Sequence, residues 1–71
     1  MSLEHSPARD GLARQGAVAD YLGLSERTME RLRLEGRGPV YCKFGRRVMY
    51  RWADVLAWAE AQRRTSTHEA A

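Results

Sequence analysis

Apolar residues recur at helical spacing in three stretches of the chain, residues 14–22, 26–35 and 53–64. A period near 3.6 residues predicts amphipathic helices, each with one face against a core and the other in solvent. We therefore expect three short helices. Their apolar positions, together with some strand residues, form the expected core: Val18, Tyr21, Leu22, Leu24, Met29, Leu32, Val55, Leu56 and Trp58.

The link between the first two predicted helices is short and has clear boundary residues. Gly23 ends the first helix, because glycine is favoured just past a helix end, and Ser25 is a suitable N-cap for the second. Gly36 ends the second helix. The start of the first helix is poorly capped, since Ala13 offers no acceptor and Gly16 lies inside the helix. Two helices with a three-residue turn match helix-turn-helix spacing.

A β-hairpin is predicted between the second and third helices. The Gly38-Pro39 pair breaks the chain, and two runs rich in β-branched and aromatic residues follow, over 40–44 and 48–51. These runs flank Gly45-Arg46-Arg47, in which the glycine supplies the turn. The predicted fold class is therefore mainly α with a small β-hairpin: a helix-turn-helix, a two-stranded wing and a C-terminal helix.

Length and composition exclude several classes of protein. Seventy-one residues suffice for one small domain, which we place at residues 12–64, between a flexible N-terminal arm (1–11) and a flexible tail (65–71). No apolar run approaches the roughly 18 residues of a membrane span, and no secretory signal is present, so we expect a cytoplasmic protein. A single cysteine excludes a disulfide framework. The sequence contains no phosphate-binding loop, metal cluster or nucleophile–base pair, so nothing in it supports an enzyme or a bound cofactor.

Positive charge gathers in the middle of the chain. The whole chain carries +3, whereas residues 27–51 hold eight basic residues against two acidic ones, a local charge of +6. Eleven of the twelve basic residues are arginines, whose planar guanidinium suits phosphates and guanine edges. The alternative is a solvated surface that reflects a preference for arginine codons. Only the placement of the arginines can separate the two interpretations.

The second predicted helix places two arginines on its outer face. Arg27 and Arg31 lie opposite the apolar stripe, about 6 Å apart along the axis at ~1.5 Å rise per residue. That gap is a little under two base-pair steps of ~3.4 Å, so both could meet neighbouring bases in a major groove, with Ser25 and Thr28 near a phosphate. The second-helix position of a helix-turn-helix favours DNA. The alternative is a solvated face balanced by the carboxylates of Glu26, Glu30 and Glu35.

The tip of the predicted hairpin has a similar pair of interpretations. Arg46 and Arg47 are adjacent at the end of a narrow β-arm, and Lys43 extends the basic strip. Such an arm suits insertion into a minor groove or contact with a phosphate backbone. Surface turns are also often charged without binding anything. The basic helix in the same small domain favours a DNA-binding wing.

Several other residues are given structural roles. Most of the six aromatic side chains are expected in the core rather than as stacking platforms for single strands, and Cys42 as a small buried hydrophobe. Glu26 and Glu30 form an i,i+4 carboxylate pair without a third ligand, so we expect no metal there. Leu34 projects from the outer side of the second helix. It either packs under the hairpin or meets a neighbouring protomer, and the sequence does not separate these alternatives.

Four segments together carry a resemblance to a known family: VADYLGLSERTM, the EGRGP after the second helix, the GRRVMYR wing and the closing ADVLAWAEA. The chain resembles the small winged helix-turn-helix proteins of the excisionase/AlpA group, relatives of the MerR DNA-binding domain, over roughly residues 12–63. Family members often open the first helix with Thr or Ser and an acidic residue, where this chain has Ala13-Arg14-Gln15-Gly16. The resemblance implies DNA-contacting roles for the matching positions Ser25, Arg27, Thr28, Arg31, Arg46 and Arg47.

The resemblance also implies a function. Excisionases are not enzymes; they bind repeated sites next to an attachment site, often head to tail, bend the DNA and steer an integrase toward excision. We therefore expect an excisionase associated with the nucleoid, with double-stranded DNA and an integrase as partners and with no membrane, small-molecule ligand or cofactor. One alternative is an AlpA-like or MerR-like transcriptional regulator that binds promoter DNA. Another is a protein-interaction module whose basic face meets an acidic partner.

Overall fold

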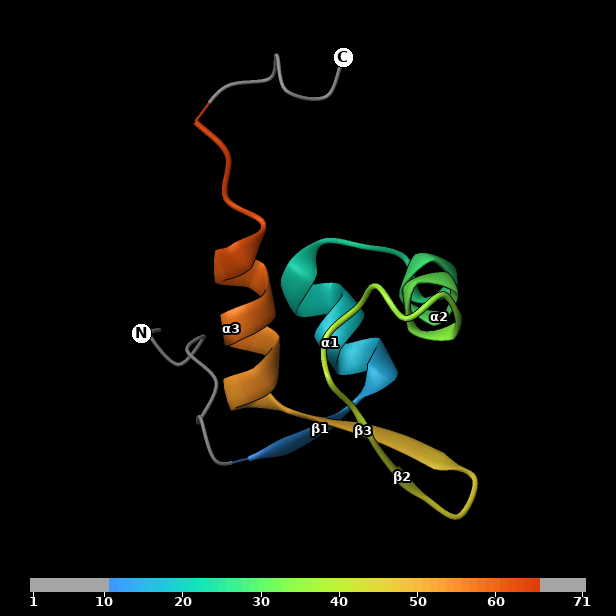
Figure 1. Ribbon diagram of the computed structural model, residues 1–71. Coiled ribbons are helices and arrows are strands. Elements are labelled where there is room, and N and C mark those ends of the chain that lie inside the picture. Colours follow the sequence, from blue (N-terminus) through green and yellow to red (C-terminus); the bar gives the residue numbers. More distant parts are fainter. Residues whose placement is uncertain (1–10, 66–71) are drawn as a thin grey trace.

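The computed structural model describes residues 11–65, which form three helices and a three-stranded antiparallel sheet (Figure 1). Residues 1–10 and 66–71, and with them most of the expected arm and tail, lie outside the described residues. The predicted fold class is confirmed, with a helix-turn-helix, a wing and a C-terminal helix. The elements are β1 (Leu12–Arg14), α1 (Gln15–Leu22), α2 (Glu26–Leu34), β2 (Cys42–Phe44), β3 (Arg47–Arg51) and α3 (Trp52–Ala61).

Local sequence accounts for the helix-turn-helix. The Thr28 backbone N–H donates a hydrogen bond to Ser25 Oγ at 3.0 Å, which caps α2 as predicted. Gly23 follows α1 with φ 74°, a left-handed conformation that costs glycine little because it has no Cβ. The N-cap of α1, Arg14, makes no side-chain capping bond, so the predicted weak start is confirmed. The helix begins at Gln15, one residue later than predicted.

The sheet contains one strand more than the predicted hairpin. β1 pairs antiparallel with β3, which thereby becomes the central strand in the order β1-β3-β2. Ala13 lies opposite Tyr50, and both side chains are buried. The Trp52 backbone N–H donates to the Gly11 carbonyl at 3.0 Å, just beyond the end of this ladder. A three-residue strand is too short to show a period-two pattern, and its backbone is ordered by pairing with β3.

The wing is tighter than the sequence predicted. Two residues, Gly45 and Arg46, join β2 to β3, and Arg47 is the first residue of β3, opposite Phe44. Gly45 has φ 63°, whereas no non-glycine residue in 11–65 has a positive φ. Glycine at the first central position, followed by a residue with negative φ, matches a type II′ turn, whose twist suits a hairpin. β2 begins at Cys42, two residues later than predicted, and its thiol is half-buried rather than buried.

The third helix is shorter at its C-terminal end than predicted. It runs from Trp52 to Ala61 instead of over residues 53–64. Residues 61–65 are all exposed, so the last predicted turn has no packing partner in the described chain. A helix end without tertiary packing is marginal even when its composition is favourable.

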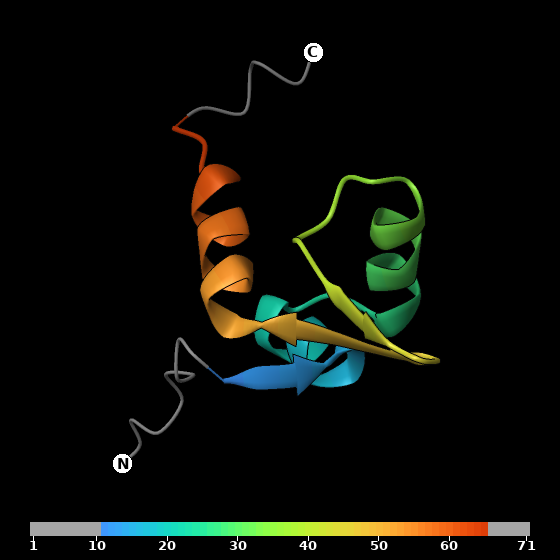
Figure 2. The same ribbon diagram turned by 60° about the horizontal axis from the view of Figure 1, so that its bottom comes forward.

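The helices share one face of the sheet. Figures 1 and 2 place α2 and α3 on opposite sides of the molecule, with α1 between them and the hairpin tip reaching toward the α2 side. Trp58 Nε1–H donates to the Arg37 carbonyl at 2.9 Å, which ties α3 to the segment that follows α2. No helix in the described part of the chain has the length and apolar content to cross a membrane.

The core is small and is built from all three helices and two strands. Its members are Ala13, Val18, Ala19, Met29, Tyr50 and Val55. The predicted core is thus confirmed at its centre by Val18, Met29 and Val55, while five of the other six predicted members are half-buried: Leu22, Leu24, Leu32, Leu56 and Trp58.

The prediction that Tyr21 is buried is wrong. Its side chain is 46% exposed, because it lies on the side of α1 that faces α3 across a gap, and its ring packs edge-to-face on Trp52 with centroids 5.4 Å apart. The expectation that most aromatic residues lie inside is met only in part. Tyr50 is fully buried and both tryptophans are half-buried, whereas three rings are exposed: Tyr21, Tyr41 and Phe44.

Replacing Gly16 with alanine should raise the free energy of unfolding by about 0.5–1 kcal/mol, because alanine is the better helix former. A Cβ there would lie 3.4 Å from Glu26 Oε2, which is the end of a flexible side chain. Urea unfolding followed by circular dichroism measures the change. Gly23→Ala is the matched control and should destabilise, because its φ of 74° strains any other residue. A less stable Gly16→Ala protein would mean that the first turn of α1 has no room for a methyl group.

Candidate nucleic-acid interface

The two faces of α2 differ sharply in burial. Met29 is fully buried on the inner face, whereas Arg27 and Arg31 are exposed on the outer one. The predicted orientation of both arginines is therefore confirmed. Leu34 continues the outer stripe one turn after Arg31 and is 70% exposed, so the alternative in which it packs under the hairpin is wrong.

The guanidinium groups of Arg27 and Arg31 are unpaired within residues 11–65, where neither makes a side-chain hydrogen bond or an ion pair. The three carboxylates expected to balance them are mostly placed elsewhere. Glu35 pairs with Arg37 at 2.6 Å, and the Glu26 carboxylate lies beside the first turn of α1, where the positive end of the helix dipole favours it.

The N-terminus of α2 is closed by its own side chains. Ser25 Oγ accepts from the Thr28 N–H and donates to Thr28 Oγ1 at 2.9 Å. Ser25 is exposed and Thr28 is half-buried. Ser25 therefore has a structural role as the cap, and the two hydroxyls lie at the end of the helix where a phosphate would meet backbone N–H groups.

The wing carries basic side chains at its turn and on both faces. Lys43, Arg46 and Arg47 are exposed, and none of their side chains makes a hydrogen bond or an ion pair within the described residues. Lys43 is opposite Val48, which packs against the core, so these two lie on the helix side of the sheet. Arg47 is one position along β3 and lies on the other side, because side chains alternate along a strand. Figure 2 shows the hairpin tip extending beneath α2.

Sequence reasoning missed a polar cluster that joins the helix-turn-helix to the wing. Arg33 Nε–H donates to Gln15 Oε1 at 3.2 Å, and the hydroxyl of Tyr50 donates to the same oxygen at 3.4 Å. The Arg33 guanidinium also lies over the Tyr41 ring, 5.6 Å from its centroid. This cluster holds α2 against α1 and against the segment that leads into β2.

The chemistry of the cluster suits a structural role. Burial raises the pKa of Tyr50 above its usual value, partly offset by the positive charge of Arg33, so the phenol is protonated and can donate at neutral pH. Arg33 follows Met29 by about one helical turn, and this spacing is the sequence signal that would have placed it near the inner face of α2. Among the arginines of α2, Arg33 is thus committed to the fold, which leaves Arg27 and Arg31 for a ligand.

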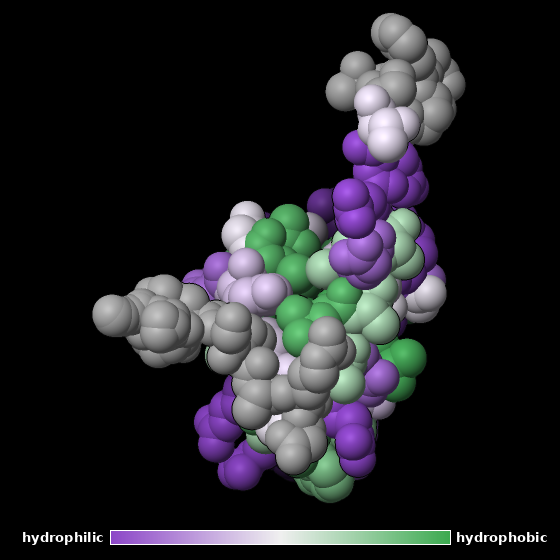
Figure 3. All heavy atoms as spheres, turned by 90° about the vertical axis from the view of Figure 1, so that its left-hand side faces the viewer, coloured by the Kyte–Doolittle hydropathy of each residue, from purple (hydrophilic) through white to green (hydrophobic). Residues whose placement is uncertain are grey.

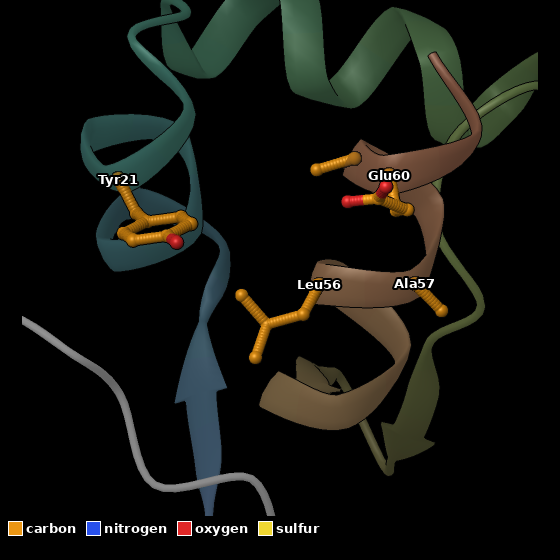
Figure 4. Close-up of a pocket in the computed structure, with 5 residues that line it drawn as sticks. Tyr21, Leu56, Ala57 and Glu60 are labelled. Atoms are coloured by element: carbon orange, nitrogen blue, oxygen red, sulfur yellow. The ribbon is translucent and has the colours of Figure 1, made fainter. Parts of the chain in front are cut away.

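A shallow hollow of about 510 Å³ lies between the C-terminal end of α1 and α3. Figure 4 shows Tyr21 on α1 facing Leu56 and Glu60 on α3, and Figure 3 shows apolar residues gathered on this side of the molecule. The Glu60 carboxylate pairs with Arg63 at 2.7 Å. The side chains that line the hollow belong to α1 and α3, so it is separate from the basic residues of α2 and the wing. Residues 11–65 contain no group of three or more side chains that could hold a metal ion.

Comparison with known proteins agrees with this geometry. The model of a family described as a helix-turn-helix domain matches residues 16–63, a span that runs from the first turn of α1 to just past α3. A search of curated proteins found no match. The matched span covers well over half of the chain and includes α2 and the whole wing. The chain is a DNA-binding helix-turn-helix protein and belongs to the family of small excisionase/AlpA-like DNA-binding proteins.

Proposed function

We propose that this protein is an excisionase, a recombination directionality factor that binds and bends double-stranded DNA near an attachment site and directs an integrase toward excision. The DNA-binding part is supported by the exposed guanidinium groups of Arg27 and Arg31 on the outer face of α2, neither of which has a partner among residues 11–65. The excision part is supported by the family to which the chain belongs. The proposal places the protein at the nucleoid, in the cytoplasm.

The proposed major-groove contact is made by α2. Four residues of helix separate Arg27 from Arg31, an axial distance of about 6 Å, so each guanidinium can reach a different base pair. Arginine forms bidentate hydrogen bonds with O6 and N7 of guanine, so these two side chains read sequence. Ser25 and Thr28 fix the register by contact with a phosphate at the helix N-terminus.

The proposed second contact is made by the wing. Lys43, Arg46 and Arg47 lie at or next to the turn, on both faces of the hairpin, so the tip presents positive charge over a wide angle. The minor groove has a negative potential that attracts arginine, most strongly where it is narrow. The wing thus adds affinity that depends little on direct hydrogen bonds to base edges.

A transcriptional regulator that binds promoter DNA is the second candidate, because the family includes AlpA-like proteins and the same surface serves either role. An excision assay with the integrase, run beside a promoter reporter, separates the two. Head-to-tail self-association on DNA is part of the proposal, and Leu34, which is 70% exposed, is available for a contact with a neighbouring protomer.

The proposal is tested by selecting bound sequences from a pool of random 30-base-pair duplexes and titrating the recovered duplex over a salt series. We expect recovery of a defined sequence. If about five phosphates are contacted, the slope of log affinity against log salt should be roughly −4 to −5. Absence of binding at low salt, with retention on an acidic protein or peptide column, would instead support a protein-interaction module and contradict the proposal.

A further inference from the structure

One aromatic side chain at the wing tip lies outside the core cluster of the described residues. Phe44 is the last residue of β2 and is 56% exposed. Its ring makes no aromatic contact with the other described residues, in contrast to Tyr41 and Tyr50, whose centroids lie 6.3 Å apart. Exposing a phenylalanine is unfavourable in water, and this one adds nothing visible to the core.

Phe44 lies beside basic residues at the narrow end of the hairpin. It lies opposite Arg47 in the β2–β3 ladder, so the two side chains stand on the same face of the hairpin. With Arg46 they line a shallow hollow of about 380 Å³ at the tip. Gly45, which lies between Phe44 and Arg46, has no side chain, so the turn itself adds little width to the tip. The end of the wing is thus an apolar ring flanked by two guanidinium groups.

We propose that Phe44 is a wedge that enters the minor groove between two base pairs and kinks the duplex, an inference that rests on the proposed DNA-binding function. Arg46 and Arg47 bring the tip into the groove by charge, and the ring then inserts at a base step and partly unstacks it. Apolar wedges of this kind kink DNA by roughly 20–90° toward the major groove. Such a kink opens the minor groove at the inserted step and bends the duplex away from the wing, while α2 occupies the adjacent major groove.

The wedge also predicts a sequence preference away from the arginine contacts. Pyrimidine–purine steps such as TA and CA unstack at the lowest cost, so the site should carry one where the wing meets the minor groove. The position of the wing is fixed relative to α2 by the Arg33 cluster with Gln15, Tyr41 and Tyr50. The step should therefore lie at a constant distance from the bases read by Arg31.

The experiment uses the full chain and the duplex recovered by selection, with 2-aminopurine placed in turn at each adenine. Unstacking raises the fluorescence of this base, and circularly permuted fragments report the bend angle by gel mobility. The variants are Phe44→Ala and Phe44→Leu. The matched control is Val40→Ala, which removes an apolar side chain that is even more exposed (67%) from the segment before β2. Far-ultraviolet circular dichroism checks that each variant is folded.

We expect the wild type, Phe44→Leu and Val40→Ala to bend the duplex and to raise fluorescence at one step. Phe44→Ala should lose more than half of the bend and the fluorescence rise, with no more than about a 10-fold loss of affinity and an unchanged salt slope. An unchanged bend in Phe44→Ala, or no fluorescence rise with the wild type, would overturn the wedge while leaving DNA binding intact. Loss of cooperativity alone would assign Phe44 to a contact between protein copies and also overturn it. If the wild type recovers no duplex, the proposed function itself fails.

Discussion

Replacing Arg31 with alanine should cost about 1–3 kcal/mol of binding free energy on the selected duplex and should relax sequence preference at one base pair. Arg31 is exposed on the outer face of α2 and has no partner in residues 11–65, so its removal leaves the fold unchanged. The lost affinity is then the lost contact with a base. Fluorescence anisotropy with the selected duplex and with the three substitutions at each base pair measures both effects.

Two other arginines act as controls for this prediction. Arg47→Ala, at the wing, should weaken binding by a similar factor on every duplex, because its contact does not depend on the identity of a base. Arg63→Ala removes the same charge from beyond the end of α3, where the side chain is 76% exposed and pairs with the surface residue Glu60. Of the three substitutions, Arg63→Ala should change the affinity for DNA least. Equal losses for Arg31→Ala on all duplexes would refute a role in reading bases.

Replacing Met29 with alanine should lower the free energy of unfolding by about 2–5 kcal/mol. Met29 is fully buried and is the only residue of α2 in the buried core of the described chain, so the substitution leaves a cavity where α2 packs on its neighbours. A domain of this size has only a few kcal/mol of stability to lose. Much of the variant should therefore be unfolded at 25 °C, with loss of DNA binding as a consequence.

Leu34→Ala is the matched control in the same helix. It removes a side chain that is 70% exposed, so it should change stability by no more than about 0.5 kcal/mol. Urea titration followed by circular dichroism compares the two variants. If Met29→Ala unfolds at the same urea concentration as the wild type, the packing of α2 on the core is not what holds the domain together.

The boundaries of the helix-turn-helix could be predicted because they depend on neighbouring residues. Ser25 caps α2 through a bond to Thr28, three residues away, and Gly23 ends α1 through its own backbone conformation. The exposure of Arg27 and Arg31 followed from the helical period in the same way, because both are fixed once Met29 is placed inside.

The elements that the sequence did not predict depend on contacts between distant residues. β1 is ordered by pairing with β3, through Ala13 opposite Tyr50, and three residues carry no pattern of their own. Arg33 and Gln15 are 18 positions apart, and nothing in either neighbourhood predicts their hydrogen bond. The exposure of Tyr21 likewise depends on how far α3 stands from α1, which tertiary packing decides.

The central claim is that α2 reads the major groove through Arg27 and Arg31 while the wing lies in the adjacent minor groove. Methylation interference on the selected duplex tests it directly, because dimethyl sulfate modifies guanine at N7 in the major groove and adenine at N3 in the minor groove. We predict that binding is blocked by N7 methylation at guanines one or two base pairs apart and by N3 methylation at adenines in the neighbouring minor groove. With Arg31→Ala, one of the sensitive guanines should become insensitive. Binding that tolerates N7 methylation at every guanine would contradict the account.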